Sequence, residues 1–228
     1  MQAEKKHATP DFSAMTDLTM LIEPAMRVYP GMARPVINRL KEHPTHNAQV
    51  SQLVITVHAG THVDAPRHFI AQGPAMENLD PSLLAGEAVL LDFSGLAPGS
   101  VITASRLAEA GNGIASGDIA VLRTGYQKVA ELESYCYLEP KAAQWLVEKQ
   151  VKCLAGDIPS VDPVNKTGAI SFDTYPSHHI LLQAGIPIVE NLFHLEKLKS
   201  DRFFFLCLPL KISDADGAPA RAVAMELI

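Results

Sequence analysis

Short apolar segments recur along this chain of 228 residues, and they constrain its fold more than any other feature. They are rich in Val, Ile, Leu or Phe and are separated by turn-forming residues, which is typical of β-strands. In the first of them, Leu53, Ile55 and Val57 predict an apolar face. Strands are predicted at residues 53–57, 86–93, 118–123, 151–155, 186–189, 202–208 and 223–227.

Three further segments have the start and stop signals of helices. Thr103 and Ser177 are suitable N-caps, and Pro140 stands in a first helical turn, where proline is tolerated. Helices are predicted at residues 103–110, 139–149 and 177–184. Because strands outnumber helices and the two are mixed in order, the fold class is mixed α/β (α+β). A single domain over residues 15–228 is predicted, after a loose tail at residues 1–14.

Composition and charge exclude several classes of function. The formal net charge of −6 leaves no basic surface for nucleic acid. The longest apolar run, residues 203–208, is far shorter than the roughly 20 residues that span a membrane. The first ten residues lack the apolar stretch of a signal peptide. Three widely separated cysteines argue against a disulfide framework and favour a cytoplasmic location.

Residues 58–68 concentrate groups that bind metals. The run HAGTHVDAPRH holds three of the nine histidines, together with Asp64. An extended chain would place residues 58, 60, 62 and 64 on one face, but four residues of strand span about 13 Å. That is too far for two imidazoles to reach one ion at about 2 Å each, so the chain must bend between His58 and His62. Gly60 permits that bend.

More candidate ligands occur later in the chain. Pro66 forces another change of course, so His68 is expected to turn back toward the same place. His178 lies in the first turn of a predicted helix, and Glu190 ends an apolar strand. A carboxylate there is costly to bury unless it is paired or binds a metal. His179 receives no role, and Asp157 and Asp162 fit either a pocket wall or loop hydrogen bonding.

The motif His58-x-Gly-Thr-His62-x-Asp64-x-Pro-x-His68 resembles the signature of the metal-dependent cyclase family. This family includes bacterial kynurenine formamidases and isatin hydrolases. The resemblance covers nearly the whole chain beyond the tail. Its further matches are Tyr29-Pro30-Gly31, Arg123-Thr124-Gly125-Tyr126, Gly156-Asp157 with Ser160-Val161-Asp162, the pair His178-His179 followed by Glu190, and residues 216–221 (DGAPAR).

The resemblance implies a swivelling β/β/α fold with a mixed, partly barrel-like sheet. It also implies ligand sets, because all five ligand positions of formamidase-like members are matched here. The positions of His58, His62 and Asp64 bind one zinc in those members, and the positions of Asp64, His178 and Glu190 bind a second. One or two zinc ions are therefore expected, with a single manganese, as in isatin hydrolases, as the alternative.

Two other positions are assigned by the resemblance. The position of His68 donates and accepts protons in formamidase-like members. Tyr29 stands where those members carry a tryptophan that stacks on the substrate, and a tyrosine ring can cover a substrate in the same way. A partly buried core tyrosine fits the sequence equally well.

These observations predict an arylformamidase-like amidohydrolase, which cleaves a small amide such as N-formylkynurenine through a metal-bound hydroxide. Hydrolysis of a lactam or lactone is the alternative within the family. Two other classes stay open: a non-haem iron oxygenase built on His62, Asp64 and His178, and a non-catalytic metal-binding module. The predicted partners are a small-molecule substrate and further copies of the chain, in a homodimer or homotetramer.

Overall fold

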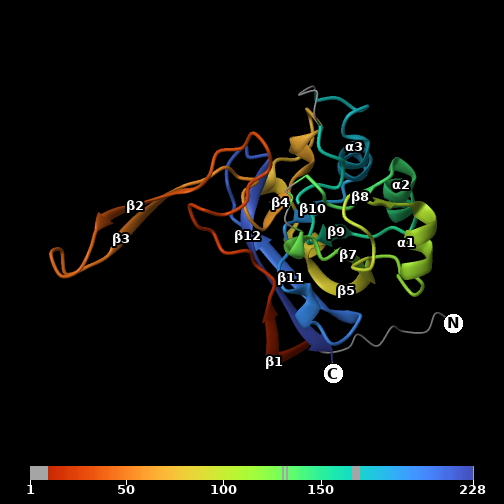
Figure 1. Ribbon diagram of the computed structural model, residues 1–228, viewed down its shortest axis with the longest axis horizontal. Helices are drawn as coiled ribbons and strands as arrows, with labels where there is room; N and C mark the ends of the chain where they lie inside the picture. Colours follow the sequence, from red (N-terminus) through yellow and green to blue (C-terminus); the bar gives the residue numbers. More distant parts are fainter. Residues whose placement is uncertain (1–9, 130, 132, 166–169, 228) are drawn as a thin grey trace.

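The computed structural model describes residues 10–129, 131, 133–165 and 170–227. Figure 1 shows a rounded body, from which one long hairpin projects. The body is built on a mixed sheet in the order β1-β12-β11-β5-β7-β9-β10-β4. The strands are β1 (Pro10–Asp17), β4 (His62–Asp64), β5 (Ala85–Asp92), β7 (Ile119–Arg123), β9 (Cys153–Gly156), β10 (Ile188–Glu190), β11 (Arg202–Pro209) and β12 (Gly217–Leu227).

The sheet closes into a seven-stranded barrel because β4 pairs with both β10 and β12. Strands β5, β7, β9 and β10 are parallel, and the other pairings are antiparallel. Strand β1 adds to the outer edge of β12. The closed mixed sheet confirms the predicted fold class, including its partly barrel-like character.

The barrel strands carry two cores, one on each face. Leu90 and Val121 pack with Phe203 and Phe205 in the barrel interior. The next residues along β5 and β7 face outward, toward α1 (Ala104–Ala110), α2 (Pro140–Glu148) and α3 (Pro176–Gln183). This alternation explains why the parallel strands have continuously apolar sequences. A small parallel pair, β6 (Val101–Ile102) and β8 (Tyr137–Leu138), lies beside the helices.

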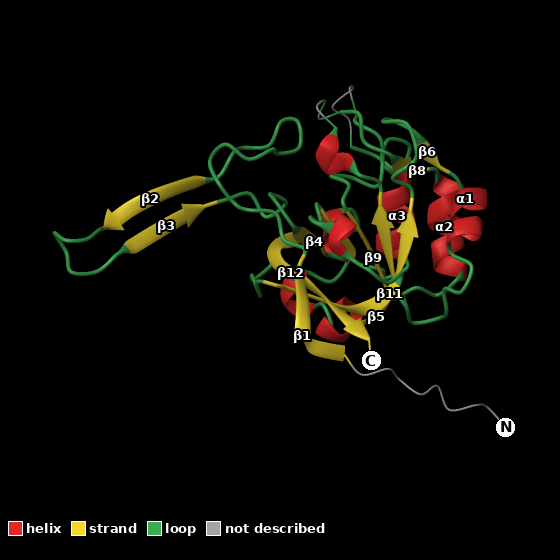
Figure 2. Ribbon diagram, turned by 60° about the horizontal axis from the view of Figure 1, so that its bottom comes forward, coloured by secondary structure: helices red, strands yellow, loops and turns green. Residues whose placement is uncertain are grey.

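The projecting hairpin consists of β2 (Val36–Lys41) and β3 (Val50–Val54). In Figure 2 it points away from the side of the body that carries α1 and α2. The prediction of a strand at residues 53–57 was wrong in its bounds and in the environment of its first residues. It ends at Val54, and Leu53 is exposed rather than part of an apolar core face.

The chain ends also differ in part from the sequence prediction. Residues 10–14 belong to β1 instead of the loose tail, because they begin the pairing with β12. Residues 1–9 of that tail lie outside the described part of the chain. Within the described residues, no helix has the length and apolar character needed to cross a membrane.

Candidate metal centre

Strand β4 presents two of the predicted ligands on one face. His62 and Asp64 flank Val63, whose side chain packs in the barrel interior, so their own side chains leave the opposite face. In the antiparallel pairing with β10, His62 lies opposite Glu190. All three side chains are buried. Closure of the barrel therefore brings Glu190 to the histidine cluster across a large sequence separation.

The chain bends between His58 and His62 as the sequence predicted. Gly60 has a positive φ of 71°, a conformation that suits glycine. A Cβ at this position would lie 3.2 Å from Met26 Cε, so the site is also tight. After β4, Pro66 opens a single 3-10 turn, and His68 ends that turn. Both bends return histidines to the side of Asp64.

His62 and His178 are each held by the ring nitrogen that faces away from the cluster. Nδ1 of His62 donates to the carbonyl of Gly60 at 2.8 Å. Nδ1 of His178 lies 2.7 Å from a carboxylate oxygen of Asp162. When Nδ1 carries the proton, Nε2 keeps a free lone pair. This anchoring is the usual arrangement behind metal-binding histidines.

Asp64 and Glu190 lie between these two imidazoles. Nε2 of His62 is 3.3 Å from Oδ1 of Asp64 and 3.5 Å from Oε2 of Glu190. Nε2 of His178 is 3.8 Å from Oδ2 of Asp64 and 3.4 Å from Oε1 of Glu190. Each carboxylate thus directs one oxygen to each histidine, so both carboxylates would be available to a cation held beside these imidazoles.

The residues fit a bound cation by two tests. Ligands held about 2.0–2.1 Å from a tetrahedral zinc ion lie about 3.3–3.4 Å apart, close to the distances above. His62 Nε2, Asp64 Oδ2 and Glu190 Oε1 are buried and have no hydrogen-bond partner among the described residues. Buried polar atoms of this kind are rare without a ligand. The triad His62, Asp64 and Glu190 has ligand atoms within 4.8 Å of one another.

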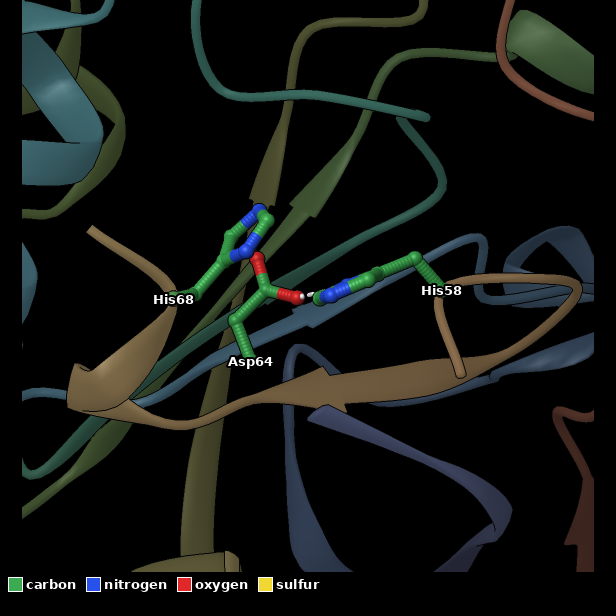
Figure 3. Close-up of side chains that lie close together, drawn as sticks. All are labelled: His58, Asp64 and His68. Carbon is green, nitrogen blue, oxygen red and sulfur yellow. Dashed lines mark hydrogen bonds and ion pairs between the residues drawn. The ribbon is translucent and has the colours of Figure 1, made fainter. Parts of the chain in front are cut away.

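His58 and His68 both lie beside Asp64 (Figure 3), and their ring centroids are 4.0 Å apart. Nδ1 of His58 is 2.7 Å from Oδ1 of Asp64. Asp216, which matched the family pattern but received no role from the sequence, joins these two histidines. One of its carboxylate oxygens lies 2.8 Å from Nε2 of His58 and 3.1 Å from Nδ1 of His68. Asp216 directly precedes β12, so only the pairing of β12 with β4 brings it to the site.

The pKa values show how strongly negative this site is. Burial alone lowers the pKa of His58, but the charges of Asp64 and Asp216 raise it to about 10. For His178, burial has the same effect, and the nearby carboxylates of Asp162 and Glu190 raise its pKa to about 10. Burial raises the pKa of Asp64, and the neighbouring His58 and His68 bring it well below its usual value. A site that retains protons so strongly also attracts a metal cation.

A cavity of about 510 Å³ opens over these residues, within the usual size of a small-molecule site. Tyr29 lines it together with His58, His62, His68 and His178. The hydroxyl of Tyr29 is buried and has no hydrogen-bond partner among the described residues. Tyr29 therefore belongs to the cavity wall, and its contact with a substrate stays a prediction.

The remaining candidates have structural surroundings. Asp157 accepts hydrogen bonds from Thr124 N, Thr124 Oγ1 and Gly125 N, at 2.8, 2.7 and 2.8 Å, and so fixes the turn after β7. Burial raises the pKa of Asp157. Asp162 accepts from the first N–H groups of α3, both at 2.9 Å, and orients His178 as well. The ring centroid of His179 lies 5.2 Å from that of Phe69.

Comparison with known proteins identifies the family of this chain. The profile of the Cyclase family matches residues 16–163. A kynurenine formamidase of Bacillus thuringiensis (strain Al Hakam) is 32 % identical over 179 residues, which cover 78 % of this chain and 80 % of that protein. The chain belongs to the Cyclase family.

Solved structures agree with this membership. Isatin hydrolase A from Labrenzia aggregata superposes with a TM-score of 0.83 at 22 % identity, over 94 % of each chain, and shows the same fold. A structure described as a potential metal-dependent hydrolase with cyclase activity gives a TM-score of 0.79 at 26 % identity, over 94 % of this chain and 98 % of that one. The prediction of a metal-dependent hydrolase of the Cyclase family is confirmed.

Proposed function

We propose that this chain hydrolyses an aryl formamide such as N-formylkynurenine, releasing formate and the free arylamine. The observation that carries this proposal is the pair of carboxylates, Asp64 and Glu190, each directed at two anchored imidazoles. The similarity to kynurenine formamidases supports the substrate class. The cavity above the site has room for one aromatic ring with a short side chain.

The cation would be zinc, held in up to two positions. His58, His62 and Asp64 would hold the first ion, and Asp64, His178 and Glu190 the second. Imidazole and carboxylate ligands suit zinc, although manganese also accepts them. When bound, such a cation supplies Lewis acidity, which polarises a carbonyl and lowers the pKa of water from 15.7 to about 7.

The chain itself supplies the proton transfer. The imidazole of His68 lines the cavity beside Asp64 and is partly exposed there. Asp216 accepts a hydrogen bond from Nδ1 of His68, which leaves Nε2 free for the substrate. His68 would take a proton from the attacking water and give it to the leaving nitrogen. Asp216 would keep the ring in the correct orientation for both transfers.

Tyr29 and the surrounding residues would position the substrate. The phenol ring covers part of the cavity, and its buried hydroxyl would donate to a carbonyl or carboxylate of the substrate. Burial raises the pKa of this hydroxyl, so it stays protonated and remains a donor. We place the enzyme in the cytoplasm, because its three cysteines are buried and free.

Elemental analysis followed by a substrate screen tests the proposal. The purified protein should contain one or two zinc ions per chain and should release formate from N-formylkynurenine and N-formylaniline. Turnover of isatin without turnover of either formamide would transfer the assignment to lactam hydrolysis. Absence of hydrolysis by the metal-loaded protein on the whole panel would contradict the proposal.

A further inference from the structure

Thr61 lies between Gly60 and His62, and its side chain is buried. Its hydroxyl both accepts and donates a hydrogen bond. It accepts from the backbone N–H of Met20 at 2.8 Å and donates to the backbone carbonyl of Asn191 at 2.6 Å. A buried polar group is costly to leave without a partner, so these two bonds resist separation of the groups that they join. Thr61 therefore holds together three segments that are distant in sequence.

The bond to Asn191 lies at the end of the pairing between β4 and β10. That pairing has three residue pairs, and the last of them is His62 opposite Glu190, two of the proposed ligands. The chain turns directly after this pair, because Asn191 has a positive φ of 56°. The end of a short strand pair opens more easily than its middle. The bond from the Thr61 hydroxyl closes this end, and so it keeps Glu190 beside His62.

The bond from Met20 fixes the start of a segment that borders the cavity. Residues 20–32 form neither a helix nor a strand, and Tyr29 within them lines the cavity. A segment without regular structure has few backbone bonds of its own, so its position depends on bonds to its neighbours. Met26 of this segment also lies against the bend that precedes Thr61. The Thr61 hydroxyl therefore anchors the segment that carries Tyr29 to the strand that carries the ligands.

A second threonine in the same region forms similar bonds away from the ligands. Oγ1 of Thr19 accepts from the backbone N–H of Ala222 at 3.0 Å and donates to the carbonyl of the same residue at 3.1 Å. These bonds tie Thr19 to β12, whereas Thr61 reaches the residue directly after Glu190. The two threonines thus offer a comparison between a contribution to folding and a contribution to the site.

We infer that Thr61 is a positioning residue whose hydroxyl sets the spacing of His62 and Glu190, a role that rests on the proposed function because it takes these two residues as ligands. The same hydroxyl holds the segment that carries Tyr29. Thr61 acts through the backbone beside these residues and contributes no ligand atom of its own. Groups that orient metal ligands typically contribute 10–100-fold to metal affinity, because a cation binds tightly only when its ligands are already in place.

The zinc affinity of the purified protein, measured by competition with a chelating indicator, tests this inference. Thr61→Ala removes both hydrogen bonds and should raise the zinc dissociation constant by about 10–100-fold. Thr61→Ser loses only the methyl group and should bind zinc as the wild type does. Thr19→Ala is the matched control and should leave zinc affinity unchanged. Wild-type affinity in Thr61→Ala, or an equal loss of affinity in Thr61→Ala and Thr19→Ala, would overturn the inference.

Further measurements separate this role from folding and from the proposed reaction. Thermal unfolding of the zinc-free variants should stay cooperative, and if Thr61→Ala does not fold, Thr61→Val removes the same hydroxyl with little change in volume. At saturating zinc, KM for N-formylaniline should be raised in Thr61→Ala and restored in Thr61→Ser, and an unchanged KM would overturn the part of the inference that concerns Tyr29.

The zinc measurement needs no substrate, so it distinguishes failure of this inference from failure of the proposed hydrolysis. Tight zinc binding without hydrolysis of any formamide would contradict the proposed reaction and leave the role of Thr61 supported by the affinities. A wild type that binds no zinc would contradict the proposed ligands and overturn the role of Thr61 with them.

Discussion

Strand β4 and the projecting hairpin of β2 and β3 are close in sequence but lie in opposite environments. His58 follows Val54 by four residues, yet His62 and Asp64 are each 1 % exposed, whereas Val54 is 55 % exposed. Within β4, each polar side chain meets partners from distant parts of the same chain. Within the hairpin, β2 and β3 pair with each other, and all their residues are exposed. Substitutions in β4 should therefore disturb the site, whereas substitutions on the hairpin should leave it intact.

The largest effect is expected at Asp64, because both halves of the site share its carboxylate. Asp64→Asn should remove most of the bound metal and reduce kcat/KM by about 1,000-fold or more, since metal-assisted hydrolysis depends on the ion. Elemental analysis and formate release measure the two quantities. Asp201→Asn, an exposed substitution of the same kind, serves as the control. Unchanged metal content in Asp64→Asn would contradict the prediction that both halves of the site share this carboxylate.

His68→Ala tests whether binding and proton transfer are separate in the site. Metal content should stay near the wild-type value, while kcat should fall by about 10²–10⁴-fold, the usual contribution of general acid–base catalysis. His194→Ala removes a half-exposed histidine outside the cavity and should change neither quantity. Full activity of His68→Ala would exclude this residue from the mechanism.

A smaller effect is expected at Asp216, which acts through His58 and His68. Asp216→Asn should reduce kcat by about 10–100-fold, as is typical for carboxylates behind metal-site histidines. Its effect on KM should be slight, because Asp216 orients the imidazole without binding substrate. Asp214→Asn changes an exposed carboxylate that pairs with Arg67, and it is the matched control. Equal kcat in the two variants would contradict the positioning role.

The smallest effect is expected for the half-exposed pair Asp92 and Arg123. The two hydrogen bonds from Arg123 lower the pKa of Asp92, and burial partly offsets this lowering. When folding lowers the pKa of a carboxyl group, that group stabilises the protein at pH values above its unfolded pKa of 3.8. This stabilisation is lost as the pH falls toward the pKa of the folded state.

Asp92→Asn should accordingly reduce the free energy of unfolding at pH 7 by less than about 1 kcal/mol, since water screens the pair. Urea unfolding at several pH values measures this, and the difference between wild type and variant should shrink progressively as the pH falls from 3.8 toward the lower folded pKa of Asp92. A loss in the free energy of unfolding at pH 7 well above about 1 kcal/mol would contradict the expectation that water screens this pair.

The local chemistry of the metal centre could be predicted from the sequence. The spacing of His58, His62 and Asp64 requires a bend, and Gly60 permits it, so one short segment holds all three residues of the first expected ligand set. Most barrel strands and all three helices were also predicted to within a few residues, because apolar runs and caps are local signals. The assignment of the ligands to bound ions stays a prediction.

Only the tertiary structure decided which distant groups join that segment and what surrounds each strand. Glu190 was a candidate from the sequence, but it and Asp216 reach the histidines only because β4 inserts between β10 and β12. The run at residues 53–57 is β-branched like a core strand, yet its first part lies on the exposed hairpin. The physical reason is that side-chain pattern determines whether a segment is extended, whereas the cover over a strand is set by its tertiary neighbours.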